Sequence, residues 1–128
     1  MADDPSLTLL GRPQRAPVDA LECFAAPAHV TEVRFECAEL TSLCPITGQP
    51  DFATVEIVYR PRRRCVESKS LKLYLWSFRE RAAFAEALAA EIAGEVHRAA
   101  EPEWVRVELA QNVRGGIALT ATAERRAD

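Results

Sequence analysis

Residues 41–51, with the sequence TSLCPITGQPD, bring together a thiol, two prolines, a glycine and a carboxylate. Cysteine is well suited to attack an electrophilic carbon near neutral pH, because part of it is already thiolate there. Proline fixes φ and glycine allows positive φ, so the segment is predicted to form a shaped loop and not a helix. Asp51 follows Cys44 by seven positions and could exchange a proton with the atom that the thiol attacks. The plainer alternatives are a buried cysteine beside a turn and an aspartate held by local hydrogen bonds.

A second candidate site lies in residues 67–72, with the sequence ESKSLK. The chain has sixteen basic residues, and Lys69 and Lys72 are its only lysines. Because a helical pattern follows, the free backbone N–H groups at its start, together with Lys69, Ser70 and Lys72, are expected to attract phosphate. The plainer interpretation is a helix that is capped by Ser68 or Ser70 and carries solvated charges in its first turn.

Three further charged features have plain structural interpretations. Arg62–Arg64 lie in a turn, where a solvated surface cluster is favoured over a role near an anionic cofactor. Glu86 has the pattern of an ordinary acid on a helix surface. Arg114, Gly115 and Gly116 are expected to form a turn that leads into a strand. The alternative is that these glycines let the backbone or Arg114 approach a ligand.

Composition limits the classes of partner. The chain has 128 residues, of which 48% are hydrophobic, and we expect an N-terminal arm at 1–28 and a single domain at 29–128. A net charge of −3 gives no general attraction to nucleic acid or to a membrane surface. No apolar run approaches the ~18 residues of a membrane span, and the N-terminus lacks the apolar core of a signal peptide. The four cysteines have no metal-ligand spacing, so we expect no metal site and reduced thiols in a cytoplasmic protein.

Hydrophobic periodicity predicts six elements that position the candidate residues. The predicted elements are strands at 30–37, 53–60, 105–109 and 117–123, and helices at about 71–78 and 82–99. In the second helix an apolar stripe is expected at every fourth residue, namely at Phe84, Leu88, Ile92 and Val96. This ββααββ order is typical of an α+β domain with a four-stranded antiparallel sheet and two helices on one face. Because such a sheet has open edges, strand-to-strand oligomerisation is expected.

Three segments, 41–52, 66–78 and 114–117, together resemble the NADPH-dependent 7-cyano-7-deazaguanine reductases in their short, single-domain form. The resemblance covers roughly residues 30–124. It implies reduction of the nitrile of 7-cyano-7-deazaguanine to the primary amine, 7-aminomethyl-7-deazaguanine, on the pathway to the tRNA nucleoside queuosine. It also implies the tunnelling fold shared with GTP cyclohydrolase I, in which subunits of a homo-oligomer join their sheets into a barrel with sites between subunits.

The resemblance implies a role for each matching residue. Cys44 matches the nucleophile that forms a covalent thioimide with the nitrile carbon, and Asp51 matches the acid that protonates the nitrogen. The expected substrate-binding positions are Val66, Glu67, Ser68, Ala85 and Glu86, and those for NADPH are Lys69, Ser70, Lys72 and Arg114. The family usually has a histidine where this chain has Ala85. Either Asp51 and water supply the protons alone, or that histidine is mainly a substrate contact, or activity is reduced.

Two other functions fit the same residues. One is an amidinotransferase on the same scaffold, which adds ammonia instead of hydride to the thioimide. Lys69 and Lys72 argue against it, because that chemistry does not need NADPH. The other is a non-catalytic oligomer that binds a deazapurine, with Ala85 as a sign of lost chemistry.

Overall fold

The computed structural model describes residues 7–10 and 15–128. Six of its elements follow the predicted ββααββ order, and a short strand pair is added to them. The elements are β1 (Cys23–Ala25), β2 (Val33–Leu43), β3 (Pro50–Arg60), β4 (Arg64–Val66), α1 (Ser68–Trp76), α2 (Ala85–Ala100), β5 (Trp104–Arg114) and β6 (Ile117–Arg126). Strand β1 lies within the segment expected to be an arm, and it pairs antiparallel with β4. The N-terminal segment therefore contributes a strand to the domain.

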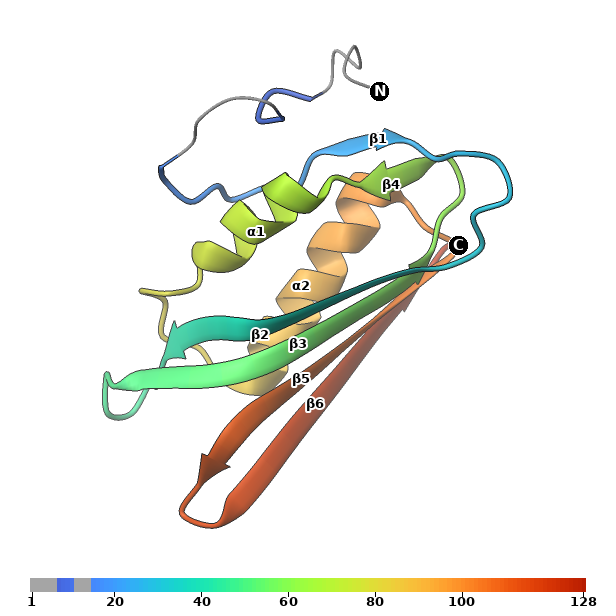
Figure 1. The fold of residues 1–128 in the computed structure, drawn as a ribbon. Coiled ribbons are helices and arrows are strands. Elements are labelled where there is room, and N and C mark those ends of the chain that lie inside the picture. Colours follow the sequence, from blue (N-terminus) through green and yellow to red (C-terminus); the bar gives the residue numbers. More distant parts are fainter. Residues whose placement is uncertain (1–6, 11–14) are drawn as a thin grey trace.

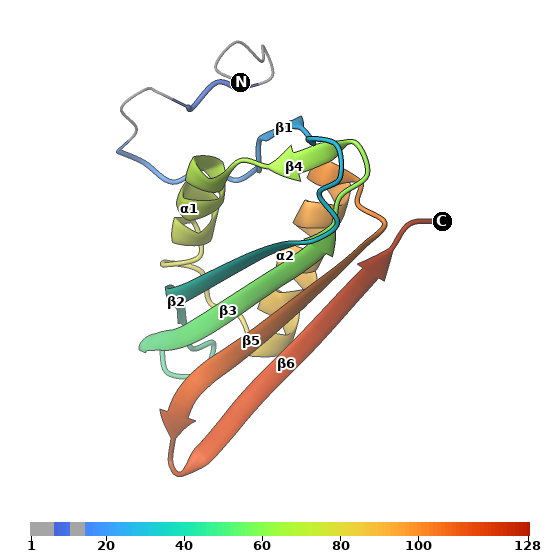
Figure 2. The ribbon, with the colours of Figure 1, turned by 45° about the vertical axis from the view of Figure 1, so that its right-hand side comes forward.

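The main sheet is antiparallel, with the strand order β2-β3-β5-β6. Figure 1 shows both helices on the same side of this twisted sheet, and Figure 2 shows the long β5–β6 pair from another side. The prediction of an α+β fold is confirmed. Alternation places one face of each strand in the core, as shown on β3 by Val55, Ile57 and Tyr59, which are fully buried beneath the helices. No helix in the described part of the chain is long and apolar enough to cross a membrane.

Two β-bulges shape the end of the sheet that carries Cys44. In β2 the register shifts between Cys37 and Leu40, and in β5 it shifts between Gln111 and Arg114. A bulge inserts one extra residue, so it reverses which side chains face the core in the rest of the strand. In β2 the core-facing residues change from odd to even positions, and Leu40 and Ser42 become the buried ones. The sequence pattern did not predict either bulge.

The helices differ from the prediction at their ends. The apolar stripe of α1 is buried as expected, but the helix begins at Ser68 and stops at Trp76. Helix α2 begins at Ala85, three residues later than expected. Phe84 was expected on its buried stripe, and this is wrong, because Phe84 is the N-cap and is largely exposed. Leu88, Ile92 and Val96 form the rest of that stripe and are buried. In α2 the predicted four-residue spacing of buried residues therefore holds only from Leu88 onward.

Candidate active site

Cys44 opens the short turn Cys44–Gln49, which joins β2 to β3. The loop is shorter than the predicted segment 41–51, because Thr41–Leu43 and Pro50–Asp51 belong to the strands. The N–H of Cys44 donates to the carbonyl oxygen of Gln49 at 2.8 Å, and the N–H of Gly48 donates to the carbonyl oxygen of Cys44 at 2.9 Å. Gly48 has φ of 71°, which confirms the predicted need for glycine. This hydrogen-bonded turn fixes the backbone of the thiol-bearing residue.

The same turn makes Cys44 acidic. A hydrogen bond from the Thr47 hydroxyl, with the backbone N–H groups of Thr47 and Ile46, lowers the pKa of Cys44 from 9.0 to about 7. These donors favour the thiolate over the thiol, and the charge of Arg114 adds a smaller effect in the same direction. About half of Cys44 is therefore ionised at pH 7. Sequence reasoning missed Thr47, although a hydroxyl three residues after a thiol in a glycine-containing turn was a usable signal.

Asp51 lies at the start of β3, on the core-facing side of the sheet. Its side chain is only 6% exposed and forms an ion pair with the guanidinium of Arg114, from the end of β5. The bulge in β5 makes this contact possible, because the register pairs Gln111 with Leu119 and Arg114 with Ile117. Arg114 therefore occupies the same face as Gln111 and reaches Asp51 from the neighbouring hairpin. Gly115 and Gly116 both have positive φ and form the turn predicted for them.

The segment that leads into α2 is attached to the end of β2. The N–H of Leu43 donates to the carbonyl oxygen of Arg81 at 2.8 Å, and the N–H of Ala83 donates to that of Leu43 at 3.2 Å. These bonds place the start of α2 beside the Cys44 turn. Glu86 is exposed in the first turn of α2, whereas Ala85 is buried and offers no polar side-chain atom.

The start of α1 is organised differently. Glu67 is buried, and its carboxylate accepts hydrogen bonds from the N–H groups of Lys69 and Ser70 at 2.7 and 2.8 Å. The expectation that Ser68 or Ser70 caps this helix is therefore wrong, since Glu67 is the cap. The N–H groups expected to attract phosphate are already satisfied by this carboxylate. What the segment still offers an anion is the ammonium group of exposed Lys72 and that of Lys69, which donates to the carbonyl oxygen of Leu9 at 2.6 Å.

The candidate residues fall into two groups within one protomer. Cys44, Asp51, Arg114 and the start of α2 gather at the hairpin end of the sheet. Val66, Glu67 and Ser68 line a mostly apolar cavity of about 460 Å³, to which Leu7 and Leu10 of the N-terminal segment also contribute. Lys72 lines a separate cavity of about 250 Å³ between α1 and β2. The lining of these two cavities includes none of Cys44, Asp51 and Arg114.

Large apolar side chains surround the hairpin end. Seven large hydrophobic residues of the described chain are exposed, and five of them lie on the Cys44 turn, beside Asp51, at the start of α2 or on the β5–β6 hairpin. These five are Ile46, Phe52, Phe84, Val113 and Ile117. Exposed apolar side chains concentrated in this way are typical of a surface that another chain covers.

Comparison with known proteins supplies the family. The family described as QueF-like protein matches residues 50–128. The NADPH-dependent 7-cyano-7-deazaguanine reductase of Anaeromyxobacter sp. (strain Fw109-5) is 50% identical over 97 residues, which cover 76% of this chain and 80% of that protein. The reductase of the same name from Frankia casuarinae is 47% identical over 118 residues, with coverage of 92% and 94%.

A solved structure agrees with this assignment. The archaeosine synthase QueF-Like, in its apo form, matches with a TM-score of 0.70 and 28% identity over 73% of this chain and 92% of that chain. The fold of the domain, the match over more than half of the chain and the identity to the reductases all lead to one assignment. The chain belongs to the QueF-like family and, within it, to the NADPH-dependent 7-cyano-7-deazaguanine reductases.

Proposed function

We propose that this chain uses NADPH to reduce the nitrile of 7-cyano-7-deazaguanine to the primary amine, as a step of queuosine biosynthesis. The relatives named for this reaction are 47–50% identical to it over most of its length. The observation that carries the proposal is Cys44, a thiol whose pKa is lowered to about 7 at the same end of the sheet as buried Asp51. Four cysteines that form no disulfide and the need for NADPH suit the cytoplasm, where we place the enzyme.

The acidity of Cys44 suits both halves of a thioimide mechanism. The thiolate sulfur adds to the nitrile carbon, one C–N π bond breaks, and the nitrogen takes a proton. When bound, NADPH supplies one hydride to the thioimide carbon and, in a second round, another to the resulting imine. Between the two rounds Cys44 must leave as thiolate, and a thiol with a lower pKa leaves faster. The turn that lowers the pKa of Cys44 therefore favours both the attack of its thiolate on the nitrile carbon and the later release of that thiolate.

Asp51 completes the proton balance of the first step. Addition of a thiol to a nitrile needs no external proton, because the proton lost from sulfur ends on nitrogen. The Asp51 carboxylate, held by its ion pair with Arg114, can accept that proton from sulfur and pass it to the nitrogen. Burial of Asp51 at the edge of the core keeps competing water away from this carboxylate.

We assign NADPH to the residues that the family resemblance implies, and their charge supports this assignment. NADPH carries several phosphate charges, and Lys72 and Lys69 supply ammonium groups, with Ser70 between them and Arg114 at the hairpin end. Lys72 is free to meet a phosphate at the surface, whereas Lys69 would exchange its contact with the carbonyl oxygen of Leu9. The proposed substrate positions remain Val66, Glu67, Ser68, Ala85 and Glu86, with the buried Glu67 carboxylate serving also as the helix cap.

We also propose that the enzyme is a homo-oligomer whose site is completed by a second copy. The cavity lined by Val66, Glu67 and Ser68 does not include Cys44, and exposed apolar side chains surround the end of the sheet that carries Cys44. Strands β2 and β6 are the open edges of the main sheet, so neighbouring copies can extend it. Mixing Cys44→Ala with Lys72→Ala protomers should restore activity that neither variant has alone. Failure of every mixture to regain activity would contradict sharing of the site.

The test of the reaction is a covalent adduct. Mixing the protein with 7-cyano-7-deazaguanine should raise its mass by one substrate, and Cys44→Ala should abolish this increase. With NADPH present, two equivalents should be oxidised for each amine formed. An adduct without NADPH oxidation would favour the amidinotransferase, and no adduct would favour the binding protein. Cys37→Ala is a matched control, because Cys37 lies on β2, is half-buried like Cys44, and should leave the adduct intact when replaced.

A further inference from the structure

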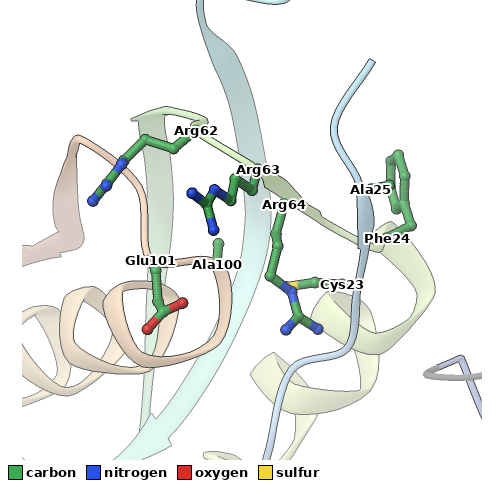
Figure 3. A pocket seen from close by; sticks show the side chains of 8 residues that line it. All are labelled: Cys23, Phe24, Ala25, Arg62, Arg63, Arg64, Ala100 and Glu101. Carbon is green, nitrogen blue, oxygen red and sulfur yellow. The ribbon is translucent and has the colours of Figure 1, made fainter. Parts of the chain in front are cut away.

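A cavity of about 670 Å³ lies at the opposite end of the sheet from Cys44, where β3 leads into β4 and α2 ends. Asp51 and Arg60 are nine residues apart on β3, so about 30 Å of strand separates the two ends. Figure 3 shows the three arginine side chains that line this hollow, with Arg63 near Ala100 at the end of α2 and Arg64 near Cys23. The lining residues are Cys23, Phe24, Ala25, Arg62, Arg63, Arg64, Ala100 and Glu101. We call this hollow the arginine cavity.

Among the described residues the three arginines have no carboxylate partner, unlike the arginines around them. Arg60 pairs with Glu103 at 2.9 Å, and Arg98 pairs with Glu95 at 2.6 Å. Within residues 7–10 and 15–128, none of Arg62–Arg64 forms an ion pair or a side-chain hydrogen bond. Three guanidinium groups around one hollow repel each other, and among the described residues that line it Glu101 is the one carboxylate. The charge lining the arginine cavity is therefore three positive and one negative, or +2.

We propose that the arginine cavity binds a phosphate dianion, either free or carried by a nucleotide. A lining charge of +2 matches that dianion, and guanidinium groups bind phosphate through paired, charge-assisted hydrogen bonds. The volume of about 670 Å³ lies within the range of small-ligand sites. The concave shape and the chain's net charge of −3 favour a small anion over the long backbone of a nucleic acid. None of the cavity's lining residues is among those proposed to act in the reaction at Cys44.

The direct test is calorimetric titration of the assembled protein with inorganic phosphate. The triple variant Arg62→Gln/Arg63→Gln/Arg64→Gln should weaken phosphate binding at least about tenfold. A matched control, Arg15→Gln/Arg79→Gln/Arg125→Gln, removes the same charge from exposed positions outside the cavity and should change the affinity less than twofold. Equal weakening in both triple variants, or no phosphate binding by the natural chain, would overturn the proposal. Circular dichroism and the melting temperature verify that each variant is folded.

Competition then identifies the source of the phosphate. If the cavity receives the adenosine end of NADPH, adenosine 2′,5′-bisphosphate should displace phosphate and the arginine triple variant should raise the KM for NADPH. If it receives an independent ligand, saturating NADPH should leave phosphate binding unchanged. Both results support a phosphate site. A single-stranded RNA that binds more tightly than phosphate, and loses this in the arginine triple variant, would overturn the assignment to a small anion. Adduct formation at Cys44 is measured separately, so failure of the proposed reaction would not affect these titrations.

Discussion

The Cys44 turn and the start of α1 both carry polar residues expected in the site, but the fold uses them in opposite ways. At the Cys44 turn, hydrogen-bond donors converge on a side chain that is open to reaction. At the start of α1, the Glu67 carboxylate is buried and already bonded to two backbone N–H groups. Polar groups are therefore arranged for chemistry at the first region and for holding the fold at the second. Four experiments test this difference between the two regions.

The largest expected effect separates two thiols, one from each region. Cys23 pairs with Val66 beside the start of α1, and burial raises its pKa to about 11, whereas that of Cys44 is about 7. At pH 7, iodoacetamide should modify Cys44 more than about 10³-fold faster than Cys23, because the thiolate is the reactive form. Peptide mass mapping over time measures both rates. Comparable rates would mean that the turn does not activate its thiol.

The second experiment concerns proton transfer at the hairpin end. Asp51→Asn keeps the shape of the side chain but removes its ability to exchange a proton, so turnover should fall at least about 10²-fold. The alkylation rate of Cys44 should change little, because Asp51 is not among the groups that set its pKa. Glu108→Gln, a half-buried carboxylate further along the sheet, is the control and should keep full turnover. Normal turnover by Asp51→Asn would show that the reaction does not need proton transfer by Asp51.

The third experiment tests the structural role of Glu67. Glu67→Ala leaves the N–H groups of Lys69 and Ser70 without their acceptor at a buried helix start, which should cost about 1–3 kcal/mol of unfolding free energy. Glu86→Ala, at the exposed first turn of α2, should cost no more than about 0.5 kcal/mol. Urea denaturation measures both. If the two variants were equally stable, the cap at α1 would not be a stabilising contact.

The smallest effect is expected from Thr47. Thr47→Val removes the hydroxyl that contributes most to the acidity of Cys44 and leaves the two backbone donors. Because these bonds favour the thiolate, the pKa should rise from about 7 towards 9, and alkylation at pH 7 should slow several-fold. The full pH profile of the alkylation rate measures the shift, with Thr41→Val on β2 as the control. An unshifted profile would show that the backbone N–H groups act alone.

The hydrophobic periodicity of the chain was sufficient to predict the six main helices and strands and the α+β fold class. Alternation on β3 and the four-residue stripe of α2 predicted the buried faces, because burial of apolar side chains requires those spacings. Cys44, Asp51, Lys72 and Arg114 were identifiable as candidates by their types and surroundings. Their roles remain predictions. The expected cap at Ser68 or Ser70 was wrong, because a glutamate is an uncommon N-cap and its burial depends on distant parts of the fold.

The amino-acid sequence alone was enough to predict the six main helices and strands and the turn that carries Cys44. Which side chains come into contact depends on the tertiary structure. Arg114 reaches Asp51 because a bulge in β5 reverses the side on which the next residues lie. Local patterns do not encode this reversal, since a bulge depends on the register with the neighbouring strand. Likewise, Glu67 became a helix cap and Arg62–Arg64 came to share one cavity through contacts between segments that are far apart in the chain.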